Sequence, residues 1–156
     1  MGQIIVEYED GSKEVIASDN SWKANLGAIQ EADIIMGETH DARLDNVGWD
    51  APGFDEGAWK APKLYPYPNG KFQAYPGTLI QERERLQALS VTEPKPGTHV
   101  FDLGKNFAGI AELKIEGQKG TEIVLKYGEM LNADGTVLTE NLRLARATDT
   151  YILNGN

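Results

Sequence analysis

The stretch Thr121-Glu122-Ile123-Val124-Leu125-Lys126-Tyr127 decides the fold class, because its polar and apolar residues suit the two faces of a pleated strand. Comparable period-two or β-branched runs occupy residues 99–103, 110–115 and 148–153. Turn sequences separate these runs at 104–106, 116–120 and 132–135. Short strands at this spacing predict an all-β fold made of antiparallel β-sandwich (jelly-roll-like) segments with little helix.

The first seventeen residues predict a β-hairpin. Ile4, Val6 and Tyr8 share one face of an extended run, residues 9–12 have turn chemistry, and an extended pattern resumes at 15–17. Two further strands are expected over 22–24 and 29–36, with a short helix as the alternative for the second. Proline and glycine then predict a long structured loop over 40–62.

The middle of the chain predicts a connector. Prolines alternate with aromatic residues over 64–77, a composition that suits an extended, semi-rigid segment, and we place a domain boundary there. Residues 79–89 are good helix formers and by propensity alone would form one short helix. A strand is expected over 91–93, before the turn at 94–97.

Composition and charge exclude several classes of function. The chain has 156 residues, and Lys+Arg 15 against Asp+Glu 24 gives 15 − 24 = −9, which disfavours nucleic-acid and anionic-membrane partners. Its cysteine count of zero excludes disulfides, a thiol nucleophile and cysteine-based metal sites. The first residues lack the basic-then-apolar build of a signal peptide, so a cytoplasmic location is slightly favoured.

Carboxylates are the abundant reactive groups. Asp41, Asp45, Asp50 and Asp55 lie in one loop with Trp49, so a glycosidase-like acid/base pair is one hypothesis. The alternative is that these residues cap turns through hydrogen bonds to the backbone, and Asp in a Gly/Pro-rich loop favours it. Calcium could receive two oxygens each from 41–46 and 132–136, but the second stretch is more typical of a hairpin turn. We therefore expect no metal and no cofactor.

The aromatic residues offer a second kind of chemistry. Trp and Tyr rings can stack on sugars, although large aromatics more often pack in cores; the candidates are Trp22, Trp49, Trp59 and Tyr67. His40 and His99 stand apart from any nucleophile motif, so a catalytic triad has no support. The glycines of the loop follow no phosphate-binding spacing.

Long runs of this sequence resemble a known family. The runs 19–24, 37–44 and 48–59 are similar to the later part of the N-terminal β-sandwich domain of bacterial α-L-rhamnosidases. The runs 100–109, 128–136, 139–143 and 147–151 look like the start of the concanavalin-like sandwich that follows it. Departures are modest: Ile110 stands where the family often has Trp, and a usual Pro between Ile80 and Gln81 is missing.

The resemblance implies a domain organisation and an inactive chain. It implies the later part of the N-terminal sandwich over 1–62, a connector and leading strand over 63–96, and the first concanavalin-like strands over 97–156. It also favours strand and loop over helix for 79–93. In that family the hydrolytic carboxylates sit in an (α/α)₆ barrel, which no part of this chain resembles. We therefore expect no catalytic residue here.

Two functions follow from these expectations. The first is a scaffold of an enzyme that releases terminal α-L-rhamnose, which would meet rhamnose-containing glycans through the parent enzyme. The second is a stand-alone carbohydrate-binding module, with contacts from Asp41, Arg43, Trp49 and Asp50. Sheet edges without partner strands would also favour self-association into a homo-oligomer.

Overall fold

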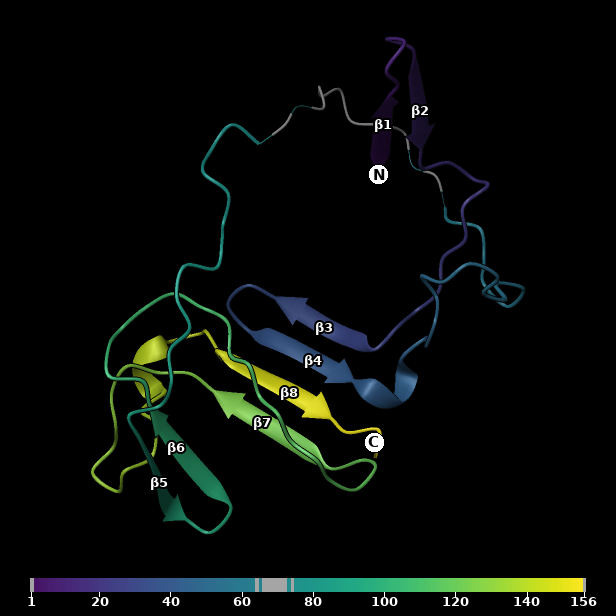
Figure 1. The fold of residues 1–156 in the computed structure, drawn as a ribbon. Helices are drawn as coiled ribbons and strands as arrows, with labels where there is room; N and C mark the ends of the chain where they lie inside the picture. Colours follow the sequence, from purple (N-terminus) through teal and green to yellow (C-terminus); the bar gives the residue numbers. More distant parts are fainter. Residues whose placement is uncertain (1, 64, 66–72, 74, 156) are drawn as a thin grey trace. The chain divides into compact units, whose positions relative to one another are not determined.

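The structure is a computed structural model that describes residues 2–63, 65, 73 and 75–155 (Figure 1). Its described elements, in chain order, are β1 (Gln3–Glu7), β2 (Lys13–Ala17), β3 (Ile29–Asp33), β4 (Gly37–Asp41), η1 (Ala42–Leu44), β5 (Ser90–Lys95), β6 (Thr98–Asp102), β7 (Glu122–Lys126), η2 (Glu140–Leu142) and β8 (Thr148–Ile152). Both η elements are single 3₁₀ turns of three residues. The predicted all-β class is confirmed, and none of the described helices is long and apolar enough to cross a membrane.

The chain divides into two compact units, which are described separately. The first contains Met1–Leu26 and Asn46–Pro76, and the second contains Gly27–Asp45 and Gly77–Asn156. The predicted connector over 64–77 belongs mostly to the first unit, but residues 64, 66–72 and 74, including Tyr67, lie outside the described residues.

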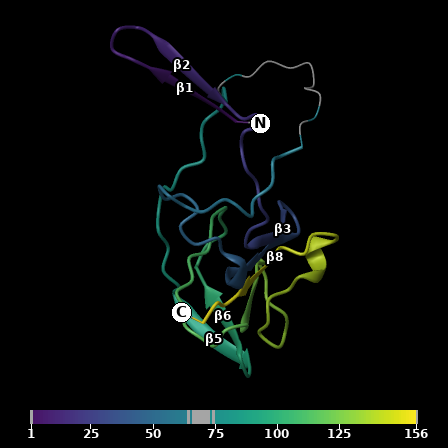
Figure 2. The ribbon, with the colours of Figure 1, turned by 90° about the vertical axis from the view of Figure 1, so that its right-hand side faces the viewer.

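The first unit contains the predicted hairpin. Strands β1 and β2 pair antiparallel from Gln3 opposite Ala17 to Glu7 opposite Lys13, and they form the two-stranded ribbon labelled in Figure 2. The expected strand at 22–24 is wrong, since only Ala24 pairs, in an isolated bridge with Lys60. The reason is a turn: the Asp19 carboxylate accepts hydrogen bonds from the backbone N–H and the hydroxyl of Ser21.

The second unit contains a four-stranded sheet in the order β3-β4-β8-β7. β3 pairs antiparallel with β4, and β7 pairs antiparallel with β8. β4 and β8 pair in parallel, from Thr39 opposite Thr150 to Asp41 opposite Ile152. A parallel pair requires a long crossover, and here the crossover contains β5, β6 and β7, so local sequence patterns could not reveal it.

Two boundaries in this sheet differ from the expectation. The strand expected over 29–36 ends at Asp33, because the Asp33 carboxylate accepts hydrogen bonds from the backbone N–H groups of Ile35 and Met36 and so forms a turn. His40 and Asp41 were expected in the long loop, yet they belong to β4. Their strand pairing with distant β8 overrides the local turn signals.

The rest of the second unit is a separate hairpin joined by irregular segments. β5 and β6 pair antiparallel, and β5 continues past the expected strand at 91–93 through to Lys95. Residues 79–89 form neither helix nor strand, so helix propensity alone misleads there. The strand expected over 110–115 is also wrong, because these residues join no strand ladder among the described elements.

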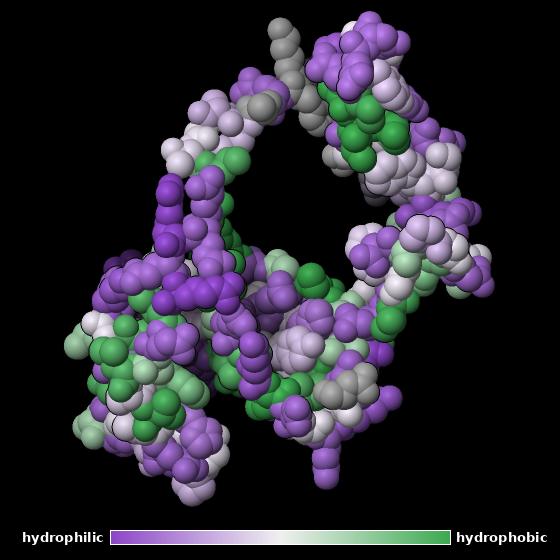
Figure 3. All heavy atoms as spheres, in the orientation of Figure 1, coloured by the Kyte–Doolittle hydropathy of each residue, from purple (hydrophilic) through white to green (hydrophobic). Residues whose placement is uncertain are grey.

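Little of the described chain is buried. The described apolar residues that are buried are Ala28, Ala42 and Leu153, and one charged residue, Asp41, is also buried. All four belong to the second unit. The accessible surface is 13599 Å², whereas a folded monomer of 17.1 kDa is expected to expose about 7,800 Å². Apolar side chains accordingly lie open on the viewed face in Figure 3. These sheets therefore lack the cover that a closed sandwich provides.

Candidate functional site

Asp41 and Arg43 form an ion pair at the end of β4. Asp41 Oδ1 accepts hydrogen bonds from Arg43 Nε at 2.8 Å and from the Arg43 backbone N–H at 3.1 Å, and Oδ2 accepts from Nη2 at 2.7 Å. This bidentate geometry is the strong form of a carboxylate–guanidinium contact. The hydrogen bonds from the Arg43 side chain hold the pKa of the Asp41 carboxyl below its usual range, against the opposing effect of burial.

The contacts around this ion pair stabilise the local fold. Asp41 is 6% exposed, and its backbone N–H donates to Ala28 O at 2.8 Å. Its carboxylate also caps η1, which begins at Ala42. Nearby in the chain, the His40 ring stacks on Tyr151 with centroids 4.8 Å apart. The pair therefore stabilises the junction between β4 and η1. Within the pair, the Arg43 side chain is the more exposed partner.

Trp49 and Asp50 lie in the other compact unit. They occupy a turn in which the Trp49 N–H donates to Asn46 O and the Ala51 N–H donates to Gly48 O. The Trp49 side chain is 63% exposed, so its ring faces solvent. Of the predicted sugar-contact residues, the structure thus brings Asp41 and Arg43 into contact, while Trp49 and Asp50 are neighbours in the sequence of the other unit.

The remaining loop carboxylates act mainly on local structure. Asp55 accepts a hydrogen bond from the Gly57 N–H, as expected for a turn cap. Asp45 lies 3.5 Å from His40 Nε2. A general acid of a glycosidase needs a raised pKa, whereas the resolved shifts among the described aspartates are all to lower pKa.

The stretch 132–136 is a turn, as the hairpin interpretation predicts. The Asn132 N–H donates to Thr136 O, and Leu131 pairs with Val137. Asp134 Oδ2 lies 2.8 Å from Lys95 Nζ, and this contact is the largest single cause that lowers the pKa of Asp134, followed by the hydrogen bonds with Thr136. Within the described ranges, no group of three or more metal-ligating side chains comes together.

Sequence reasoning missed a polar junction between β4, β7 and β8. The Asp149 carboxylate accepts hydrogen bonds from the Glu38 N–H and from the Tyr127 hydroxyl, each at 2.7 Å. Burial first, and then this hydrogen bond, raises the pKa of Tyr127. Asp149 is the one charged residue in the β8 sequence Thr-Asp-Thr-Tyr-Ile, and this charge within a strand was the available signal.

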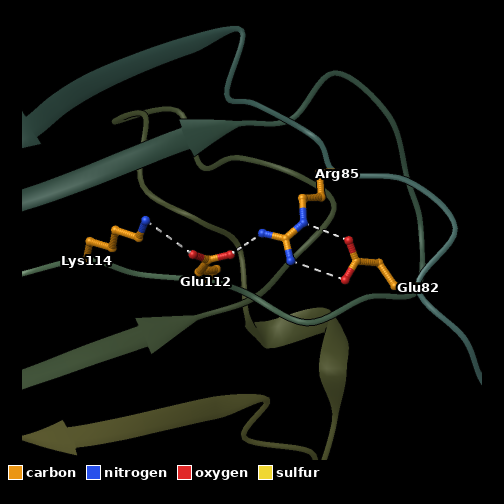
Figure 4. Close-up of polar contacts among 4 residues, drawn as sticks. All are labelled: Glu82, Arg85, Glu112 and Lys114. Atoms are coloured by element: carbon orange, nitrogen blue, oxygen red, sulfur yellow. Dashed lines mark hydrogen bonds and ion pairs between the residues drawn. The ribbon is translucent and has the colours of Figure 1, made fainter.

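A second missed feature is a chain of charges between two irregular segments. Arg85 donates to both oxygens of Glu82, at 2.7 and 3.2 Å, and through Nη1 to Glu112 Oε2 at 2.7 Å (Figure 4). Lys114 Nζ lies 3.7 Å from the other oxygen of Glu112. These contacts tie residues 79–89 to residues 110–115 without a strand ladder.

The fold places the chain among all-β proteins built from β-sandwich segments, and comparisons with known families narrow that class. The model of the α-L-rhamnosidase N-terminal domain matches residues 1–84. The model of the bacterial α-L-rhamnosidase concanavalin-like domain matches residues 92–156. The chain belongs to the α-L-rhamnosidase family, so the predicted resemblance is confirmed.

Solved relatives share both sequence and fold with this chain. The α-L-rhamnosidase of Streptomyces avermitilis, solved with L-rhamnose, is 43% identical over 99% of this chain with a TM-score of 0.83. The enzyme from Dictyoglumus thermophilum is 34% identical with a TM-score of 0.87, and that from Aspergillus terreus is 32% identical with 0.88, each over 99% of this chain. This chain spans 15% of the first relative and 18% of the other two.

Proposed function

We propose that this chain is the non-catalytic β-sandwich portion of an α-L-rhamnosidase, a glycoside hydrolase that releases terminal α-L-rhamnose. Its role is to support the catalytic part of that enzyme or to shape its substrate cleft. The observation that carries the proposal is the ordered match of two non-catalytic domain models along one short chain. The uncovered apolar surface supports it, because such faces require further polypeptide to pack against.

We keep the predicted division of the chain as part of this proposal. Residues 1–62 supply the later part of the N-terminal sandwich, 63–96 supply a connector and leading strand, and 97–156 supply the first strands of the concanavalin-like sandwich. The chain contacts a rhamnose-containing glycan only as part of the parent enzyme, and the chain alone does not hydrolyse it. The lowered pKa of the aspartates named above supports this, since none of those groups is poised as a general acid.

A chimera tests the scaffold role. In the Streptomyces avermitilis α-L-rhamnosidase the matching segment is either deleted or replaced by these 156 residues. The replacement is expected to release nitrophenol from an aryl α-L-rhamnoside, whereas the deletion variant and this chain alone are expected to release none. Full activity of the soluble deletion variant would refute a supporting role, and release by this chain alone would refute the absence of catalysis.

Sugar binding by the chain itself is the second candidate, favoured by the exposed Trp49 ring. A solvent-facing indole beside a carboxylate can stack on an apolar sugar face while the carboxylate accepts hydroxyl hydrogen bonds. The candidate contacts lie in two units and are proposed separately: Trp49 and Asp50 in one, Asp41 and Arg43 in the other. Isothermal titration with L-rhamnose, with and without calcium, tests this candidate. Binding heat that is lost in Trp49→Ala but kept in the control Trp22→Ala supports a sugar-binding module. If the natural chain gives no binding heat, the candidate is rejected.

We also propose that the isolated chain self-associates through its uncovered sheet edges. Unpaired strands are templates for pairing with another chain, and the exposed surface exceeds that of an ordinary monomer of this mass. Light scattering over a concentration series measures this directly. A mass that stays monomeric throughout would contradict it.

A further inference from the structure

Residues 110–116 have the alternation of a strand without a strand partner. Ala111, Leu113 and Ile115 alternate with Glu112 and Lys114. In the part of the chain that the structure describes, their backbone groups form no backbone hydrogen bond and join no ladder. An unpaired run of this kind is a template for an added strand.

The space beside this segment is open. Leu113 is 42% exposed, Ile115 is 44% exposed and Ile110 is 96% exposed. Four consecutive residues, Leu113, Lys114, Ile115 and Glu116, border open space on one side of the segment. Covering the apolar side chains among them is favourable.

The charged side chains of the segment differ in how firmly they are held. Glu112 is fixed by its hydrogen bond with Arg85, which is itself held on both oxygens of Glu82 (Figure 4). Among the residues that the structure describes, Lys114 has one ion-pair contact, at 3.7 Å with Glu112, and its side chain is 91% exposed. The segment therefore presents one positioned carboxylate and one available ammonium, two residues apart.

We propose that two copies of this chain pair antiparallel through residues 110–116, with a twofold axis at Leu113. Leu113 then faces Leu113 of the second copy, and Ala111 faces Ile115. Glu112 faces Lys114 on both sides of the axis, so two opposite-charge pairs form. This inference rests on the self-association proposed above, but it places the pairing at the unpaired segment 110–116 rather than at the edge of a sheet, and it names the register.

The sequence selects this register over its neighbours. A shift by one residue places apolar side chains opposite charged ones, because side chains alternate between the two faces. Centring the axis on Glu112 sets two glutamates opposite each other, and centring it on Lys114 sets two lysines opposite each other. Like charges directly opposite destabilise a strand pair, whereas opposite charges stabilise it. The register centred on Leu113 sets no like charges opposite each other, and it places an apolar residue opposite a charged one only at the segment's ends, where Ile110 faces Glu116.

The segment has exposed apolar side chains that such a dimer can bury, those of Ile110, Leu113 and Ile115. The interface between two identical segments is isologous, which is the commonest symmetry of soluble dimers.

Single cysteines test the register, because the natural chain has none. Directly opposite residues lie about 4.5–5.5 Å apart at Cα, within the range of about 4.4–6.8 Å that a disulfide spans. Residue 111 or 115 lies about 14 Å from its own copy, at a strand rise of about 3.4 Å per residue. Mild oxidation is expected to cross-link Leu113→Cys, to leave Ala111→Cys and Ile115→Cys single, and to cross-link a mixture of the last two.

Sedimentation in 0.15 M salt provides the second readout. The natural chain is expected to dimerise, and Lys114→Glu is expected to raise the dissociation constant about tenfold, because both opposite-charge pairs become like-charge pairs. Lys23→Glu, an equal charge change outside the segment, is the matched control and is expected to leave it unchanged.

The outcomes separate the two proposals. A monomer at every concentration overturns self-association and this inference together. A dimer that cross-links neither at Leu113→Cys nor in the Ala111→Cys and Ile115→Cys mixture keeps self-association and overturns this register, and shows that another edge or face pairs instead. If Leu113→Cys fails to fold, as judged from its far-UV circular dichroism, the mixture of Ala111→Cys and Ile115→Cys still tests the register.

Discussion

Replacing Gly37 by alanine should dismantle one end of the four-stranded sheet. Gly37 begins β4 with φ of +110°, a backbone conformation that residues with a Cβ rarely adopt. A Cβ at this position would overlap the carbonyl oxygen of Thr148, and it would lie 2.6 Å from the Thr148 carbonyl carbon and 2.9 Å from Asp149 Oδ1. None of these atoms is the free end of a flexible chain, because Asp149 Oδ1 is held by the Glu38 N–H at 2.7 Å.

The cost has two parts. The positive φ alone costs an L-residue about 1–2 kcal/mol. Relieving the overlap requires β4 and β8 to separate at this end, which weakens the Glu38–Asp149 hydrogen bond and the bond from the Thr148 N–H to Met36 O. At about 1 kcal/mol net for each bond, the total is about 3–4 kcal/mol, a large share of the 5–15 kcal/mol that ordinary domains possess.

Gly97→Ala is the matched control in the same unit. Gly97 has φ of +76°, and a Cβ there would meet nothing within 4 Å, so only the backbone cost of about 1–2 kcal/mol applies. Urea unfolding followed by far-UV circular dichroism measures both variants, and amide exchange in β4 and β8 localises the effect. If Gly37→Ala costs no more than Gly97→Ala, the steric reasoning is refuted.

Three further predictions concern polar contacts in the same unit. Tyr127→Phe removes a partly exposed hydrogen bond and should cost about 0.5–1 kcal/mol at neutral pH; since the pKa of Tyr127 is raised, this contribution is present below pH 10 and lost as pH rises through the raised value, which stability measurements in alkali would show. The Asp134 pKa is lowered from 3.8, chiefly by Lys95, so the stabilisation is present above about pH 4 and lost as pH falls through the folded pKa; Lys95→Ala should raise that pKa in carboxyl NMR titrations, and an unchanged value would contradict the assignment. Arg43→Lys gives up the bidentate contact, so the pKa of Asp41 should rise toward its usual range and acid unfolding should begin at a higher pH.

Local sequence predicted the elements whose partners lie close in the chain. The first hairpin needs only its own turn, where the Gly11 N–H donates to Tyr8 O and the Asp10 carboxylate accepts from the Ser12 N–H and hydroxyl. The turn at 132–136 is likewise held by its own residues. Such features depend on side-chain chemistry within a few residues, which a sequence displays directly.

Elements with distant partners were harder to predict. β4 extends through His40 and Asp41 because β8 pairs with it in parallel, and nothing near His40 in the sequence indicates that partner. The candidate residues divide in the same way: hydrogen bonds join Asp41 to Arg43, two positions apart in the sequence, whereas Trp49 lies in the other compact unit. Asp149 was missed because its partners are distant in the sequence: Glu38 lies in β4 and Tyr127 directly follows β7.

The strand expected at 110–115 shows how the need for a distant partner strand bears on function. Its alternation is as regular as that of β7, yet β7 forms a ladder with β8, and residues 110–115 form none with any described part of the chain. Strand propensity measures fitness for a pleated, half-covered surface, so it is realised only where a partner strand completes the hydrogen bonds. The unpaired strand pattern at 110–115 and the exposed apolar side chains thus have one explanation, which is that this segment requires a partner strand. In the parent enzyme we expect further polypeptide to provide it, and in the isolated chain a second copy can do so through Leu113.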